Sequence, residues 1–192
     1  MKIRRLNKKA AMEMSVGTIV TIVLLMTVLI LGLVLVRKIF SGSIDVVDMT
    51  DRQIKDEVNK LFSKDDKLVV YPDTREVEIP IGDNRGKFGL GIKNLGGTGG
   101  GDFSYEVEAT SISKECSGGE NPVNQIRAET WITLGAKENN IRIAPGETVA
   151  KNVKLNIPIG SPLPCSVRYS ITVKVGNEVY ATSDIDVILV SK

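Results

Sequence analysis

The pattern of apolar and polar residues divides the chain into three kinds of segment. The first runs from Met14 to Val36 and contains no charged residue. As a helix at about 1.5 Å per residue it is roughly 34 Å long, enough to cross the apolar core of a bilayer, which is about 30 Å thick. Apolar side chains lie all around this helix rather than on one face. The pattern therefore predicts a membrane-spanning helix within residues 14–40, preceded by a basic leader over 1–13.

The second kind of segment is an amphipathic helix, predicted within a stalk of residues 41–66. Thr50 and Gln53 have the spacing of a capping box at the start of a helix over about 51–62. One narrow face of that helix carries its apolar residues, Ile54, Val58, Leu61 and Phe62. We expect this face to pack on the domain that follows, and packing on neighbouring subunits is the alternative.

The third kind of segment alternates apolar and polar residues with a period of two, which is typical of β-strands with one buried face. Gly176-Asn177, between two alternating runs, predicts a two-residue hairpin turn of type II′. Eight strands are predicted in the domain of residues 67–192, over 68–71, 77–81, 88–93, 103–110, 127–134, 148–157, 166–175 and 178–190. Short strands with turn signals and no intervening helix favour an all-β Ig-like sandwich.

Charge is distributed unevenly along the chain. Residues 1–38 carry seven basic side chains and one acidic side chain, whereas the rest of the chain carries 18 basic and 22 acidic ones. Five of the basic residues precede the apolar segment and two follow it. Because basic flanks are retained in the cytoplasm, we expect a single-pass protein of the cell membrane with a cytoplasmic N-terminus and an extracellular C-terminal domain.

The two cysteines, Cys116 and Cys165, both lie in the part that we expect outside the cell, 49 positions apart. An oxidising compartment permits disulfides, so the sequence predicts a bridge between them. Two free buried thiols are the alternative.

Few residues have the pattern of a catalytic or ligand-binding site. The chain has no histidine, which excludes histidine-based triads and histidine-ligated metals, and two cysteines without a C-x-x-C pair exclude a closed zinc site. The carboxylates of Asp65-Asp66 and Asp83 lack the spacing of an EF-hand loop. Trp131 is expected in the core. We therefore predict that the protein is not an enzyme and binds no cofactor, metal ion or nucleic acid.

Residues 8–32, KKAAMEMSVGTIVTIVLLMTVLILG, resemble the N-terminus of archaeal type IV pilin-like proteins, including archaellins. Those proteins have a short basic leader and a long uncharged helix that often opens with a run such as Gly17-Thr18-Ile19-Val20 here. The resemblance implies that a prepilin-type peptidase cuts between Ala10 and Ala11, and that the helix packs with its copies in a filament core. It also places Glu13 near the new N-terminus, as a charge at the helix end. The usual glycine before the cut is absent, and Glu13 is third in the cut chain rather than fifth as in many pilins.

A second resemblance covers most of residues 67–192. The strings GIKNLG (91–96), IAPGETVAKNVKLNIP (143–158) and YSITVKV (169–175) are similar to the Ig-like modules of prokaryotic cell surfaces of the CARDB type. In those modules a strand ends in an Asn-x-Gly turn, and a Pro-Gly-Glu corner precedes the next long strand. This resemblance implies architecture only, because fold does not give function.

Two functions are consistent with these patterns. The first is a pilin-like structural subunit of the cell surface, whose N-terminal helix is held by membrane lipid and then packs with copies of itself into a type IV pilus-like filament. The second is a permanently anchored surface protein whose Ig-like domain binds another envelope protein, in a surface-layer or archaellum stator-like role. Removal of the leader distinguishes the two, because only the first requires the cut.

Overall fold

The computed structural model describes residues 17–36, 49–96, 101–118 and 121–191. The chain divides into two compact units, Met1–Ser41 and Gly42–Lys192. The described part of the first unit is one apolar helix, Gly17–Val36. The second unit contains a helix and two β-sheets.

The helix α2 (Asp51–Leu61) is the amphipathic helix that the sequence predicts. Its capping box is formed: the Thr50 hydroxyl accepts a hydrogen bond from the Gln53 amide at 3.3 Å, and the Gln53 side chain accepts one from the Thr50 amide at 2.8 Å. Ile54 and Val58 are completely buried and pack with residues of two strands, β1 (Leu68–Tyr71) and β7 (Thr148–Leu155). The expected packing of this apolar face on the following domain is therefore confirmed.

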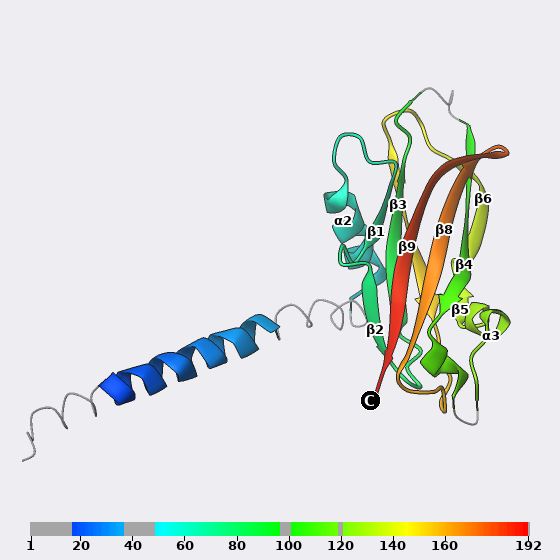
Figure 1. Ribbon diagram of the computed structural model, residues 1–192. Helices are drawn as coiled ribbons and strands as arrows, with labels where there is room; N and C mark the ends of the chain where they lie inside the picture. The colour runs from blue at the N-terminus through cyan, green and yellow to red at the C-terminus, as the bar shows by residue number, and fades with distance from the viewer. Residues whose placement is uncertain (1–16, 37–48, 97–100, 119–120, 192) are drawn as a thin grey trace, which may run out of the picture. The chain divides into compact units, whose positions relative to one another are not determined.

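Nine strands in the described residues form two sheets that pack face to face (Figure 1). The four-stranded sheet has the order β1 (Leu68–Tyr71), β3 (Gly86–Lys93), β7 (Thr148–Leu155) and β5 (Ile132–Leu134). The five-stranded sheet has the order β2 (Glu76–Pro80), β9 (Glu178–Val190), β8 (Cys165–Val175), β4 (Asp102–Ile112) and β6 (Lys137–Arg142). Neighbouring strands are antiparallel, except that β2 and β9 are parallel. This is the all-β Ig-like sandwich that the alternation predicts.

The hydrophobic core lies between the two sheets. Phe88, Leu90 and Ile92, at alternate positions of β3, are completely buried there. The lone tryptophan, Trp131, is 1% exposed in the same core, as the sequence predicts. Apolar residues at every second position thus supply the burial that holds the sheets together.

Two glycines of β3 lie on its other face, beneath α2. A Cβ atom on Gly89 would lie 2.5 Å from a methyl carbon of Ile54 and 2.6 Å from one of Val58. A Cβ atom on Gly91 would lie 2.5 Å from Val58. Packed carbon atoms are separated by about 3.5–4.0 Å, so α2 can approach this strand only because both positions lack a side chain.

Two turns close one end of the sandwich, which we name the distal pole (Asn94–Gly96 and the β8–β9 hairpin). The Asn94 side chain donates to the Ile143 carbonyl at 2.9 Å and accepts from the Gly96 amide at 2.9 Å, so it joins the GIKNLG and IAPGET strings. In the hairpin, φ is +59° at Gly176 and negative at Asn177. That combination defines the predicted type II′ turn.

The structure corrects the prediction of a strand over 127–134. The helix α3 (Gln125–Glu129) occupies the first part of this segment, and only β5 is a strand. The Asn124 side chain caps α3 by accepting a hydrogen bond from the Arg127 amide at 2.9 Å. The expectation of no helix between the strands is therefore wrong. A 3₁₀ helix, η1 (Lys114–Ser117), also follows β4, and β6 has no counterpart among the predicted strands.

Candidate functional site

The apolar helix Gly17–Val36 is the first candidate functional element. An 18-residue window of this helix has a mean hydropathy of 3.2. The 20 residues of the helix span roughly 30 Å, the thickness of a bilayer core. All of its large apolar side chains are at least 50% exposed. The hydroxyls of Thr21 and Thr27 donate to carbonyls one turn earlier, at 2.6 and 2.8 Å, so they are satisfied within the helix. By length and composition, this helix could span a membrane.

The residues to which the pilin resemblance assigns a role lie outside the described residues. These are Ala10 and Ala11 at the predicted leader cut and Glu13 at the helix end. The basic residues Arg37 and Lys38, used to predict the topology, are outside them too. The cut, the role of Glu13 and the topology therefore stay predictions.

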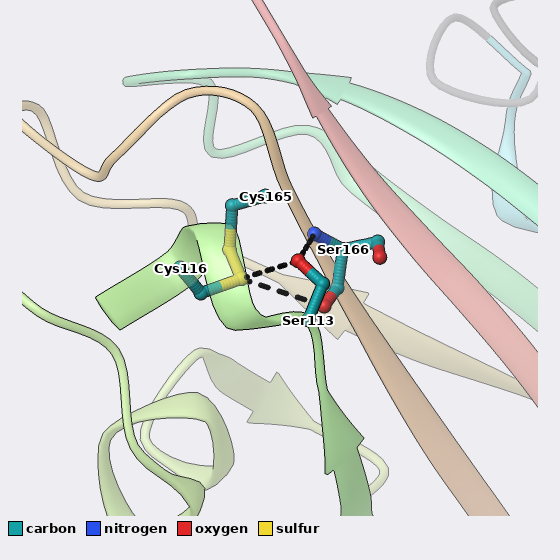
Figure 2. The surroundings of a disulfide bond; sticks show 4 residues. All are labelled: Ser113, Cys116, Cys165 and Ser166. Atoms are coloured by element: carbon teal, nitrogen blue, oxygen red, sulfur yellow. Dashed lines mark hydrogen bonds between the residues drawn. A yellow bond between two sulfur atoms is a disulfide. The ribbon is translucent and has the colours of Figure 1, made fainter. Parts of the chain in front are cut away.

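Cys116 and Cys165 form a disulfide, as the sequence predicts (Figure 2). Cys116 lies in η1, just after β4, and Cys165 is the first residue of β8. These strands pair along their length, with Ile112 opposite Val167 near the end of the ladder. Both cysteines are buried. The bond therefore fixes the 3₁₀ turn to the end of this ladder.

Ser113 orders the backbone beside the disulfide. Its hydroxyl accepts a hydrogen bond from the Ser166 amide at 3.2 Å and lies 3.3 Å from the Cys116 sulfur (Figure 2). Because a disulfide sulfur has no proton, the hydroxyl is the donor in the second contact, and the 3.5 Å approach of the sulfur to the Ser166 carbonyl is packing only. These contacts give the cysteine pair a structural role.

A hollow of about 360 Å³ adjoins the disulfide, on the outer face of the five-stranded sheet. Arg168 lines this hollow, and its guanidinium group donates to both carboxylate oxygens of Asp186, at 2.8 and 2.7 Å. This pairing raises the pKa of Arg168. The other lining residues are Glu76, Ser111, Ser113, Ser166 and Ile188. They include no nucleophile with an adjacent base. Among the described residues, no group of three or more cysteine, aspartate or glutamate side chains lies close enough together to hold a metal ion.

The end of the sandwich at which the chain enters is the second candidate element. Met49 lines a hollow of about 380 Å³ together with Arg85 of the β2–β3 connection. The Gly82 amide of that connection donates to the Ile157 carbonyl, just after β7, at 3.0 Å. Three segments thus meet at one end, which we name the proximal pole (residues 49–51, 81–85 and 156–164).

The proximal pole carries exposed aliphatic side chains beside cationic ones. Ile159 is 87% exposed and Leu163 is 45% exposed. The hollow at this pole is also lined by Lys87 and Lys154. Lys154 donates to the Asp51 carboxylate at 2.8 Å, which holds the pKa of Asp51 below its usual value. Sequence reasoning did not single out these residues, although the turn signal of Pro158 and Gly160 around Ile159 was present.

Comparisons with known proteins leave the family open. No family model matches the chain, and no curated protein matches its sequence. Among solved structures, the chain is similar to the ASH/PapD-like domain 7 of human CEP192, with 10% identity, a TM-score of 0.41, and 68% of this chain and 89% of that chain covered. It is also similar to WR4, an MSP family member of C. elegans, with 10% identity, a TM-score of 0.34, and 66% and 98% covered. Neither likeness adds to what the sheets themselves show.

Proposed function

We propose that the chain is a cell-surface structural subunit of the type IV pilus-like kind. Its apolar helix first holds it in the membrane, with the N-terminus cytoplasmic and the sandwich outside. After removal of residues 1–10 by a prepilin-type peptidase, the helix packs with its copies in a filament core. The observation that carries this proposal is an uncovered apolar helix of membrane-spanning length on a separate compact unit.

Two further observations support export of the sandwich. The disulfide between Cys116 and Cys165 fits an oxidising compartment. The basic residues concentrated before the helix favour a cytoplasmic N-terminus. On this proposal the sandwich is not an enzyme, and its partners are membrane lipid, copies of the chain and other envelope proteins.

The second candidate function is a permanently anchored surface protein whose sandwich binds another envelope component. One observation favours it: Ile54 and Val58, two of the four residues of the apolar face of α2, are completely buried in the chain's own sandwich. These two residues are therefore not available for packing between neighbouring subunits.

The mass of the intact protein extracted from membranes distinguishes the filament subunit from the permanent anchor. Loss of residues 1–10 supports the filament subunit, and an intact leader supports the permanent anchor. Glu13→Gln sharpens the test, because a carboxylate among apolar helices needs a positive partner such as the new amino terminus of a neighbour. For a filament subunit, we expect this variant to insert into membranes at wild-type levels but to be depleted from sheared surface filaments. Wild-type amounts of the variant in filaments contradict the charge pairing.

A further inference from the structure

The proximal pole is the part of the sandwich that follows the membrane helix most closely along the chain. The helix ends at Val36, and Met49 is already part of the pole. Twelve residues, 37–48, separate them. If the helix is anchored in a membrane, a link of only twelve residues keeps the local concentration of the pole at the bilayer surface high, so even a weak attraction to that surface suffices for contact.

The structure of the 156–164 connection presents an aliphatic side chain at the tip of this pole. The Ser161 amide and hydroxyl both donate to the Pro158 carbonyl, at 3.4 and 2.9 Å. Gly160 has a φ of +84°, as the third residue of a type II turn requires. This turn places Ile159 at its second position, where the side chain is 87% exposed. An aliphatic side chain held in this way is costly to leave in water.

The charges beside this tip suit an anionic surface. Arg85, Lys87 and Lys154 line the hollow of the pole, and so does Asp51, whose carboxylate pairs with Lys154 at 2.8 Å. Arg85 pairs with Asp83 at 2.8 Å, but the carboxylate side chain is 5% exposed whereas that of Arg85 is 60% exposed. The cationic side of this pair therefore faces solvent. Of the three cations, Arg85 is exposed, and Lys87 and Lys154 are half-buried. Aliphatic tips flanked by cations are typical of surfaces that enter the interfacial layer of a bilayer.

We propose that the proximal pole rests on the outer surface of the membrane. Ile159 and Leu163 enter the layer between headgroups and acyl chains, and Arg85 and Lys87 face anionic headgroups. This inference rests on the proposed membrane anchoring of the chain. It applies to the anchored protein and to a filament subunit before assembly.

Fluorescence quenching by brominated lipid tests the proposal. The full chain is reconstituted in phosphatidylcholine vesicles, with and without phosphatidylglycerol, whose acyl chains carry bromine near the headgroup. Ile159→Trp is compared with Val179→Trp, a matched control, because Val179 is 60% exposed at the distal pole. Val179 and Val190 lie eleven residues apart on β9, roughly 36 Å at 3.3 Å per residue, and the Val190 carbonyl binds the Ile81 amide of the proximal pole. Trp131, buried in all variants, gives a common background.

We expect the added tryptophan of Ile159→Trp to be quenched about threefold or more relative to that of Val179→Trp, and more strongly when phosphatidylglycerol is present. Equal quenching of the two variants overturns the proposal that the proximal pole rests on the membrane. A blue-shifted but unquenched Ile159→Trp overturns it as well, because protein rather than lipid then covers the pole. Equal quenching of Ile159→Trp in both lipid compositions overturns the role of the cations. Resistance of the chain to alkaline carbonate extraction is measured in parallel, and its loss refutes the proposed anchoring instead.

Discussion

Two buried serines of the sandwich differ in what their hydroxyl groups contact. Each is 8% exposed. The Ser161 hydroxyl donates to the Pro158 carbonyl at 2.9 Å. The Ser183 hydroxyl, on the inner side of β9, has no hydrogen-bond partner among the described residues. A buried polar group without a partner loses its hydration and gains nothing in return.

This contrast predicts opposite effects of the same substitution. We expect Ser183→Ala to raise the free energy of unfolding by about 1 kcal/mol, because it removes an unpaired buried hydroxyl. Ser161→Ala should lower it by about 1 kcal/mol, because it removes a hydrogen bond. Urea unfolding of the full chain in detergent, followed by Trp131 fluorescence, measures both. A loss of stability in Ser183→Ala contradicts the assignment and indicates a bound water at that hydroxyl.

At the scale of elements, the contact of α2 with β3 depends on glycine. We expect Gly89→Ala to cost about 1–3 kcal/mol, since its Cβ atom would lie 2.5 Å from Ile54 and 2.6 Å from Val58. In this variant, amide hydrogen exchange should accelerate more in α2 than in the rest of the sandwich. Gly118→Ala is the matched control, because its Cβ atom meets only the Glu115 carbonyl at 3.4 Å. Unchanged protection of α2 in Gly89→Ala would show that the helix does not need this close approach.

The disulfide links two elements that are distant in sequence, η1 and β8. Replacing Cys116 and Cys165 together by alanine should lower the free energy of unfolding by about 4 kcal/mol on the chain-entropy model, because the bond spans 49 positions. Urea unfolding of the double variant beside the wild-type chain measures the loss. In the unreduced, unfolded wild-type protein neither thiol should react with maleimide, and stoichiometric labelling would refute the bond.

Elements with strong local signals could be predicted from the sequence. The capping box of Thr50 and Gln53 located α2, and period-two alternation located seven of the nine described strands close to their observed bounds, with β5 at the end of an eighth predicted run. β6 could not be predicted in this way, because its sequence KENNIR is polar and its strand conformation depends on pairing with β4. The segment around Trp131 is rich in β-forming residues, which concealed the helix-capping signal of Asn124.

The candidate site was predictable only in part, because some of its features depend on residue type alone and others on contacts that form only on folding. A disulfide and an apolar helix are determined by residue type, so Cys116, Cys165 and the segment 14–36 could be named in advance. The proximal pole is assembled from three segments that meet only after folding. The exposure of Ile159 follows from the turn conformation of Gly160, so an isolated isoleucine in the sequence gives no sign of it.

At the scale of the whole molecule, the titrating groups predict how stability depends on pH. The chain has no histidine, so we expect a flat profile between about pH 5 and pH 9. Burial raises the pKa of Tyr105 to about 12 and raises that of Tyr169 as well. Above about pH 10 the unfolded chain therefore loses tyrosine protons that the folded chain keeps, and the free energy of unfolding falls as pH rises toward 12. Urea titrations across this range measure the slope. Tyr105→Phe should make it shallower, and an unchanged slope would contradict this origin.

The division of the molecule into two units predicts that the sandwich is independent of the apolar helix. Within the described residues, the core between the sheets and the α2 contacts involve only residues from Met49 onward. In the part of the chain that the structure describes, the long uncovered apolar surface is confined to Gly17–Val36. A chain of residues 49–192, refolded under oxidising conditions, should therefore be a soluble monomer by size-exclusion chromatography with light scattering. Its circular dichroism should be dominated by β-structure, with α2 and α3 as the minor helical part. A mainly helical spectrum contradicts the fold. Concentration-dependent assembly contradicts the independence of the sandwich and shows that contacts between copies form without the apolar helix.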